Sequence, residues 1–414
     1  VTLSNETTTV NTAQEAGKKK KKLWLLTIPA VVLLLALLLV CCGGLTGTSP
    51  GKLKNFLQSE GSGVIEIKGD VKIDEPLVVN GDKTIKGNGR IILKGELAGE
   101  WPKGSKKASS WGAGCTILDL EDTDKMSAIL NVSDGATLTI DGSAKVDGNK
   151  FGNGIHVKDG GKLIVKGKST IENGRYANIV ISEKASAIIE GGSVNNAATH
   201  GVVNKGKLDI TGGTLSGAET GAVVYNTGTA TQSGGTIEKA GVHNVYIAAG
   251  TFTMTGGIIT ENEADGIGGG VFVDYKGIHV GGTAIITDNT AKGKPNNVYL
   301  NGSERYISNA VGQTTAIPNE PLREGAKIGV TCAEIKHYED FGKADSGFLA
   351  ENVQYFESDD KTYFVDTQID SNGKVRFSLA YDQDGCVYVT AEGEETKGTT
   401  DAYGRVYSTC SSDT

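Results

Sequence analysis

The sequence predicts an all-β protein whose main body is a right-handed parallel β-helix with three strands per coil. Glycine accounts for 59 of the 414 residues, about twice its usual share, whereas proline contributes 7 and aromatic residues make up 6%. From Gly61 onward, short β-rich runs are broken by Gly, Asn and Asp, and Gly-Gly pairs recur at a nearly constant spacing. These features are typical of thin stacked layers joined by tight turns.

The repeat length is visible in the Gly-Gly pairs. They begin at residues 191, 212, 234, 256 and 281, so the steps are 21, 22, 22 and 25 residues. One period holds three strand signals, at Val202–Val203, Leu208–Ile210 and Thr214–Leu215. Stacking such coils would pair each strand in parallel with its copy about 4.8 Å away and fill the interior with Ile, Val and Leu. A leucine-rich horseshoe has a similar period, but it needs an L-x-x-L-x-L frame and a helix in each repeat, which this sequence lacks.

A membrane anchor is expected near the N-terminus. Residues 23–40 form an uncharged apolar run of 18 residues, close to the length of about 20 needed to cross a bilayer. Five lysines precede it, which predicts a cytoplasmic N-terminus and an extracellular main body at the cell surface, attached to the lipid bilayer by a single pass. A cleaved signal peptide and a lipoprotein signal at Cys41 or Cys42 are the alternatives. The apolar run is long for a signal peptide, and no small-x-small cleavage site follows it.

The chain therefore divides into six parts. Leu53, Phe56 and Leu57 have the i, i+3, i+4 spacing of a short amphipathic helix that would cover the first coil. Beyond residue 300 the regular period is lost, although short strand signals continue. The expected organisation is a cytoplasmic segment (1–22), a transmembrane signal-anchor (23–42), a linker and capping helix (43–60), the parallel β-helix (61–310), irregular last coils with a C-terminal cap (311–380), and a short β module (381–414).

Charge and cysteine content exclude some classes of partner. The net charge is −8, and because residues 1–50 carry +3, the remainder carries −11. An acidic body disfavours nucleic-acid binding, which depends on Lys and Arg neutralising phosphates. The six cysteines form no C-x-x-C pair and the histidines form no ligand-spaced cluster, so no structural metal site or cofactor is expected. Cys386 and Cys410 are candidates for a disulfide, although spacing alone does not fix the pairing.

Two stretches show a resemblance to known proteins. The opening helix signal and the turn Asp82-Lys-Thr-Ile-Lys-Gly-Asn-Gly89 resemble the start of the pectate-lyase-like β-helix family. The stretch 253–300 is similar to repetitive β-helix surface proteins of gut-type bacteria, as are the segments 323–331 and 355–365. The resemblance covers residues 50–365 and implies a parallel β-helix at the cell surface, in a non-catalytic, adhesin-like branch.

The same family includes polysaccharide lyases and hydrolases, so catalysis is the alternative. Lyases of this fold use several carboxylates to hold Ca²⁺ together with an Arg or Lys base, and hydrolases use paired carboxylates. The Asn-Thr-Asp, Asp-Asp, Gly-His-Gly and Arg-x-Lys segments of the hydrolases do not occur in the coils, and Asp359–Asp360 lies beyond the repeats. We therefore expect no catalytic residues and no enzyme activity.

Several polar residues have a structural explanation that we favour over a catalytic or metal-binding one. Asp141, Asp147 and Asp159 are candidates for calcium ligands, although Asp before Gly more often forms a turn. The histidines His156, His200 and His243 look like coil-surface residues. Asn173, Asn196, Asn262 and Asn289 recur at comparable turns, which predicts a broken asparagine ladder.

The main candidate for ligand binding is a column on one strand of each coil. In triplets such as Val245-Tyr246-Ile247 and Val271-Phe272-Val273, the flanking residues should face inward and the middle residue outward. The predicted outward column is His156, Val180, Val203, Val224, Tyr246, Phe272 and Tyr299. An exposed apolar column suits sugar rings or a protein partner, unless a loop or residues 311–380 cover it.

A second candidate is the insertion from Glu96 to Cys115, which interrupts the period and carries Trp101 and Trp111. These tryptophans either contact a ligand or pack against the main body. The sequence thus predicts a rigid, membrane-anchored scaffold or adhesin for extracellular glycan or protein, with His156, Tyr246, Phe272, Tyr299, Trp101 and Trp111 as ligand contacts.

Overall fold

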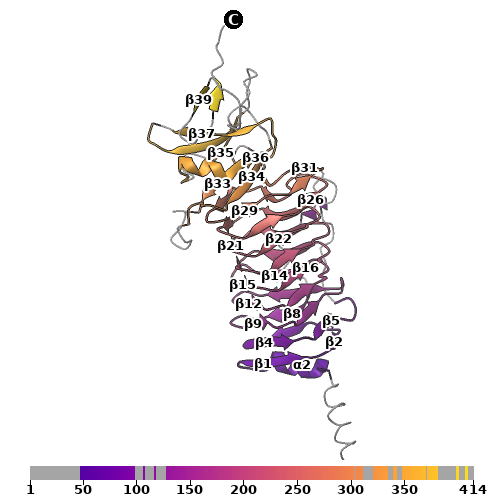
Figure 1. The fold of residues 1–414 in the computed structure, drawn as a ribbon. Helices are drawn as coiled ribbons and strands as arrows, with labels where there is room; N and C mark the ends of the chain where they lie inside the picture. Colours follow the sequence, from indigo (N-terminus) through magenta and orange to yellow (C-terminus); the bar gives the residue numbers. More distant parts are fainter. Residues whose placement is uncertain are drawn as a thin grey trace, which may run out of the picture. The chain divides into compact units, whose positions relative to one another are not determined.

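A computed structural model of the chain describes residues 47–97, 106–107, 116–117, 127–302, 304–310, 320–333, 339–342, 347–369, 371–380, 398–400 and 406–408. Most of the strands in these ranges form a parallel β-solenoid of about 10 turns, which confirms the predicted all-β parallel fold (Figure 1). No helix within these ranges is long and apolar enough to cross a membrane. The predicted transmembrane segment at 23–42 and the candidate pair Cys386 and Cys410 lie outside the described residues.

Each regular turn contributes one strand to each of three parallel ribbons. The first ribbon is a 10-stranded sheet of β1 (Gly63–Ile67), β4 (Asp82–Gly87), β9 (Thr137–Ile140), β12 (Lys162–Val165), β15 (Ser186–Ile189), β18 (Lys207–Ile210), β21 (Thr229–Gln232), β24 (Thr251–Met254), β28 (Gly277–Val280) and β33 (Tyr306–Asn309).

The second and third ribbons belong to one 20-stranded sheet. The second ribbon contains β2 (Asp70–Ile73), β5 (Arg90–Leu93), β10 (Lys145–Asp147), β13 (Thr170–Glu172), β16 (Ser193–Asn195), β19 (Thr214–Ser216), β22 (Thr236–Glu238), β25 (Ile258–Thr260) and β29 (Ile285–Ile286). The third ribbon contains β3 (Leu77–Val79), β8 (Ala128–Val132), β11 (Asn153–Val157), β14 (Ala177–Ile181), β17 (His200–Asn204), β20 (Ala222–Asn226), β23 (His243–Ile247), β27 (Val271–Val273) and β32 (Val298–Leu300). The three strand signals of one period fall in β17, β18 and β19, so the predicted three-strand coil is confirmed.

Other described elements lie before, after or beside these ribbons. The helices are α2 (Pro50–Gln58) and the 3₁₀ helix η2 (Ala350–Tyr355), and two further strands of the large sheet are β34 (Lys327–Cys332) and β36 (Phe356–Ser358). Two small sheets consist of β26 (Glu263–Ala264), β30 (Thr290–Ala291) and β31 (Lys294–Pro295), and of β35 (Glu339–Gly342), β38 (Val375–Ala380) and β37 (Phe364–Ile369). Two strand pairs are β6 (Lys106–Lys107) with β7 (Thr116–Ile117) and β39 (Gly398–Thr400) with β40 (Val406–Ser408). The pair β39 and β40 is antiparallel and falls in the segment where the sequence predicts a short β module.

Aliphatic side chains fill the interior of the solenoid, because the same position faces inward in successive coils. One such column of the first ribbon contains Ile65, Ile85, Ile140, Val165, Ile189 and Ile210. All six are buried, whereas the residues between them reach solvent in strands such as β12 and β15. Each fully buried Val, Leu or Ile contributes about 1.5–3 kcal/mol, so these columns are the main source of stability.

Paired glycines form the corner between the first and second ribbons. The second glycine of each pair has a positive φ, as at Gly213 (78°) and Gly235 (71°), which residues with a side chain rarely adopt. The first glycine is needed for a different reason, because a Cβ on Gly212 would lie 2.5 Å from the carbonyl oxygen of Glu190 in the preceding coil. The backbone atoms nearest to Gly235 belong to the preceding pair, so the glycine pairs are stacked along one edge.

A short helix, α2, precedes the first coil. The hydroxyl of Ser49 accepts a hydrogen bond from the backbone N–H of Lys52 (3.3 Å), which caps the N-terminus of the helix. Leu53 and Leu57 are buried in the same hydrophobic core as the first coil, and the Leu57 carbonyl accepts a hydrogen bond from the Asn80 N–H (2.9 Å). These contacts place α2 against the beginning of the solenoid.

The parallel stacking continues past residue 310, the predicted end of the regular β-helix. β34 pairs with β29 through its first residues and with β32 through its last, so one strand spans the corner between the second and third ribbons. β36 pairs with the middle of β34 and adds a further layer.

Asp359 connects this last layer to the coil before it. Its carboxylate accepts hydrogen bonds from the Asn297 backbone N–H (2.7 Å), the Asn297 Nδ2 (2.5 Å) and the Thr331 hydroxyl (2.7 Å). Burial raises the pKa of Asp359, and these hydrogen bonds oppose the shift. Asp360 instead accepts hydrogen bonds from the N–H and hydroxyl of Thr362, two residues along the chain, so only Asp360 stabilises the local backbone.

We predict that Gly212→Ala lowers the free energy of unfolding by about 1–3 kcal/mol, because its methyl group overlaps a backbone oxygen of the adjacent coil. The matched control is Gly51→Ala in α2, where a Cβ would meet nothing within 4 Å, and which should raise stability by about 0.4–1 kcal/mol. Urea-induced unfolding of the two variants measures both changes. Equal midpoints for the two variants would contradict the stacked corner.

Candidate functional site

The third ribbon carries the outward column that the sequence predicts as a binding face. The residues paired along it are Asn131, His156, Val180, Val203, Tyr225, Tyr246, Phe272, Tyr299 and Thr331. The prediction is wrong at one position. Val224 pairs with Val202 and Val245 and belongs to the interior core, and Tyr225 takes its place in the outward column.

Aromatic rings follow one another along this face of the ribbon. Consecutive ring centroids are 4.8–5.6 Å apart, within the range of favourable edge-to-face and stacked contacts. We call this set the aromatic ladder; it consists of Tyr176, His200, Tyr225, His243, Tyr246, Phe272 and Tyr299.

The outward column is buried, which contradicts the prediction of an exposed stripe. His156 and Phe272 are 0% exposed and Tyr246 is 4% exposed, whereas Tyr299 is partly buried. Together with Val180 and other neighbours, Tyr246 and Phe272 form a second hydrophobic cluster outside the interior core. Strands such as β17 and β23 are consequently buried on both faces. A buried side chain offers no surface to a glycan or a protein, which argues against His156, Tyr246 and Phe272 as ligand contacts. Tyr299 is partly buried, and its role as a ligand contact stays a prediction.

Trp101 and Trp111 lie outside the described residues. The insertion that carries them begins after β5 and ends before β8.

The three histidines predicted at the coil surface are also buried in the third ribbon. His156 Nε2 lies 3.0 Å from the Ser182 hydroxyl. Burial lowers the pKa of His200 from 6.5 to about 4 and lowers the pKa of His243 by the same amount. Both rings are therefore neutral at neutral pH and serve packing and hydrogen bonding.

The three candidate calcium ligands do not converge. Asp141 accepts a hydrogen bond from the Gly142 N–H, and Asp159 accepts one from the Lys184 N–H. Asp147 is held by Arg90 and by neighbouring amides. In the described ranges, no group of three or more His, Cys, Asp or Glu side chains is placed to hold a metal ion.

A column of residues with left-handed backbone forms the corner between the second and third ribbons. Its members are Asn173, Asn196, Gly217, Lys239, Glu261 and Asp288, with φ values of 52–68°. Asn173 and Asn196 occupy this column, whereas Asn262 and Asn289 do not, so the four residues predicted as one asparagine ladder do not share one position in the coils. Asn262 and Asn289 follow the left-handed residue, are 1% exposed, and donate hydrogen bonds to backbone carbonyls within the corner.

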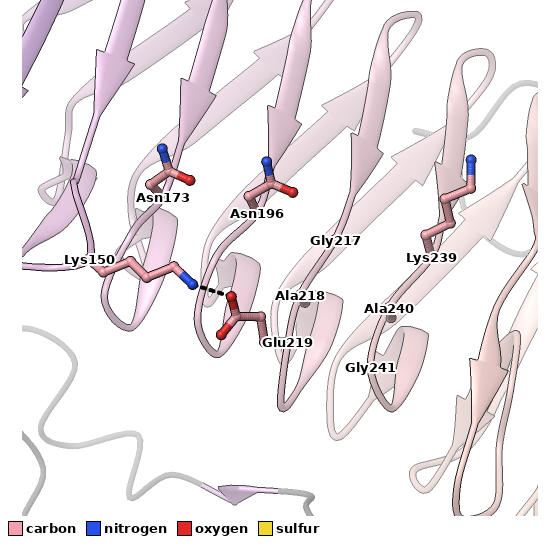
Figure 2. Close-up of a pocket in the computed structure, with 9 residues that line it drawn as sticks. All are labelled: Lys150, Asn173, Asn196, Gly217, Ala218, Glu219, Lys239, Ala240 and Gly241. Carbon is pink, nitrogen blue, oxygen red and sulfur yellow. Dashed lines mark hydrogen bonds and ion pairs between the residues drawn. The ribbon is translucent and has the colours of Figure 1, made fainter.

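A groove opens along this corner over successive coils (Figure 2). Its volume is about 450 Å³, and its lining consists of Lys150, Asn173, Asn196, Gly217, Ala218, Glu219, Lys239, Ala240 and Gly241. We call it the corner groove. It forms where the left-handed column lacks a side chain, because Gly217 follows the two asparagines and precedes Lys239.

Small residues keep the floor of the corner groove flat. Ala218 and Ala240 are buried there, and neither carries more than a methyl group. A Cβ on Gly241 would collide with the carbonyl oxygen of Glu219 in the preceding coil, so this position cannot hold a larger residue without a backbone shift. The stacking that builds the solenoid therefore also determines the shape of the groove.

The charged groups of the corner groove are paired. Figure 2 shows Lys150 reaching along the corner to Glu219, with which it forms an ion pair. Both side chains are about half exposed, so this pair contributes at most about 1 kcal/mol. Lys239 contacts Glu261 (3.0 Å) and Glu238 (3.2 Å), and these two carboxylates raise its pKa.

This arrangement suits hydrogen bonding to a neutral, extended ligand. The amide of Asn196 is exposed, and an amide both donates and accepts hydrogen bonds. Glu219 is the only carboxylate in the lining of the corner groove, whereas glycoside hydrolysis uses two carboxylates on opposite sides of the bond. The groove exists because Gly217 occupies one position of the left-handed column. The Gly and Ala residues of segment 217–241 are the feature of the sequence that could have indicated this groove.

We predict that Phe272→Ala lowers the free energy of unfolding by about 3–5 kcal/mol, because it leaves a cavity in a buried cluster. Phe151→Ala is the control, since Phe151 is 37% exposed and its loss should change stability by about 0.5 kcal/mol or less. Thermal or urea-induced unfolding measures the difference. Similar small effects for both variants would indicate that Phe272 is exposed and would contradict its burial in the cluster.

No known protein family, curated protein or solved structure matches this chain.

Proposed function

We propose that the chain is a membrane-anchored, extracellular β-helix scaffold that binds a neutral, hydroxyl-rich glycan in the corner groove without transforming it. In this proposal it belongs to the adhesin-like branch of the pectate-lyase-like proteins. The apolar run at 23–40 and the lysines before it support the anchor and its orientation. The regular stacking of coils supports the role of a stiff spacer.

The observation that carries the proposal is the gap at Gly217. Two successive coils present the amides of Asn173 and Asn196 at the corner, and the next coil presents only the backbone of Gly217 beside buried alanines. A sugar ring offers hydroxyl groups to amides and apolar C–H faces to a flat floor, which this combination matches. Because coils are about 4.8 Å apart, a glycan chain lying along the corner would meet two asparagines, then the open position at Gly217, then Lys239, each in the next coil.

The charge balance supports binding over catalysis. The groove's lysines are both engaged with glutamates, so neither stands ready as the base of a lyase. Glu219 lies on the surface in an ion pair, whereas the general acid of a glycosidase usually lies in a buried, apolar pocket. A lyase or hydrolase remains the alternative activity, and turnover of a bound polysaccharide would establish it.

The test is a glycan array probed with the full-length chain and with Gly217→Asn. This variant places an asparagine where the preceding rungs already have one, and asparagine tolerates a left-handed backbone. We expect it to fill the groove and weaken binding at least about tenfold, which is about 1.4 kcal/mol.

Thr229→Asn is the matched control, because it adds the same side chain at an exposed position of the first ribbon. It should bind as the unaltered chain does. Binding that survives in Gly217→Asn would exclude the corner groove, and binding lost equally in both variants would point to a general disturbance.

A further inference from the structure

Two buried histidines occupy equivalent positions on the outer face of the third ribbon. The register pairs Ala177 with His200 and Ala222 with His243, so both rings lie in one column with an alanine between them. His200 is 1% exposed and His243 is 0% exposed. This column lies beside the tyrosines and Phe272 of the aromatic ladder.

His200 holds two coils together through a bond that only its neutral form can make. Its Nδ1 accepts a hydrogen bond from the backbone N–H of Ala222 at 3.0 Å, so the proton of the neutral ring lies on Nε2. Nε2 is buried and has no hydrogen-bond partner among the described residues. A protonated ring would place two N–H donors against each other between β17 and β20, where an acceptor is now required.

His243 is held in a different way. Its Nδ1 donates to the carbonyl of Gly268 (2.6 Å), and its ring stacks on Phe272 at 4.8 Å. Protonation would keep that hydrogen bond but would put a positive charge into an apolar cluster. Asp274 offsets this cost in part, and it is also held by the hydroxyl of Tyr246 (3.1 Å).

The described titratable groups around the two rings are few. Tyr176 and Tyr225 contact His200, and Tyr246 contacts His243. The positive charge of a protonated His243 also lowers the pKa of His200, after the larger effect of burial. His156 lies further along the same face.

We propose that the third ribbon is an acid-sensitive seam: protonation of His200 separates β17 from β20 on the outer face, protonation of His243 loosens the next strand, β23, and together they expose the aromatic ladder while the first ribbon stays paired. The first ribbon lacks such groups in these coils, since β18 reads KLDI and β21 reads TATQ. Its hydrogen bonds therefore do not depend on a histidine. The seam lets acid change one face of the scaffold without unwinding it.

The direction of the pH effect follows from the two pKa values. Burial lowers the pKa of each histidine from 6.5 to about 4 in the closed ribbon, so an open ribbon binds more protons between these values. Stability of the closed ribbon is intact above pH 6.5 and falls as the pH drops toward 4. At pH 5, opening should be at least about tenfold more frequent per histidine than at pH 7.

Hydrogen–deuterium exchange of the full-length chain, measured at pH 7 and pH 5 and corrected for intrinsic exchange, tests the seam. Peptides covering β17 and β20 should lose protection at pH 5 by at least about tenfold, whereas those covering β18 and β21 in the same coils should keep theirs. Loss of protection in all four strands together, or in none, would overturn the proposal.

His200→Asn is the informative variant, because Asn153 already serves this role two coils earlier. The Asn153 Oδ1 accepts the backbone N–H of Ala177, as His200 Nδ1 accepts that of Ala222. We expect His200→Asn to keep β17 and β20 protected at pH 5. A variant that opens as far as the unaltered chain would refute the role of His200.

Two further variants complete the test. His243→Asn should keep β23 protected at pH 5 while β17 and β20 still open, because only His200 bridges those two strands. His279→Asn is the control, since His279 lies in β28 of the first ribbon and bonds Ser308 (2.6 Å). It should leave the opening of β17 and β20 unchanged, and an altered opening would contradict the seam.

Discussion

The close stacking of one coil on the next is the constraint on which the rest of this structure depends. Adjacent strands in a ribbon pair at about 4.8 Å, so every position in a coil sits directly beside the same position of its neighbours. Each residue must therefore pack against the equivalent residues of the coils on either side. The glycine pairs show this most clearly, because Gly212 has no room for a methyl group and Gly213 has a backbone that side chains disfavour. The same constraint produces the aliphatic core, the aromatic ladder and the corner groove.

Much of the fold can be predicted from the sequence, because residues that stack in one column recur at regular intervals along the chain. The Gly-Gly spacing and the short Ile- and Val-rich runs predict the three-strand coil, and both depend on backbone geometry and burial that each repeat must satisfy. The alignment fails at Val224, where a coil of slightly different length shifts the register by one residue and Tyr225 faces outward instead. A shift of one residue exchanges the two faces of a strand, so small errors in spacing have full effect on a single side chain.

The candidate site was less predictable, for a physical reason. Alternation tells which residues point out of the solenoid, but it does not tell whether something lies over them. His156 and Phe272 are placed on the predicted face and are nevertheless fully buried. The corner groove forms because Gly217 has no side chain where the neighbouring coils have one. The sequence does not reveal this gap until the residues that stack in the left-handed column are known. Asn262 and Asn289 illustrate the same limit, because one step along the corner converts an exposed turn residue into a buried hydrogen-bond donor.

β34 has a consequence for how proteins of this type change in length. A parallel solenoid has no intrinsic number of coils, since each coil contacts only its neighbours. By pairing with β29 and β32 at once, β34 joins the second and third ribbons in one strand, and among the described residues only the short strand β36 stacks on it. Duplication or loss of one repeat in the middle would thus lengthen or shorten the solenoid by one layer and leave both described ends intact. The length of such a solenoid can therefore change by gene duplication without changes to the structures at its ends.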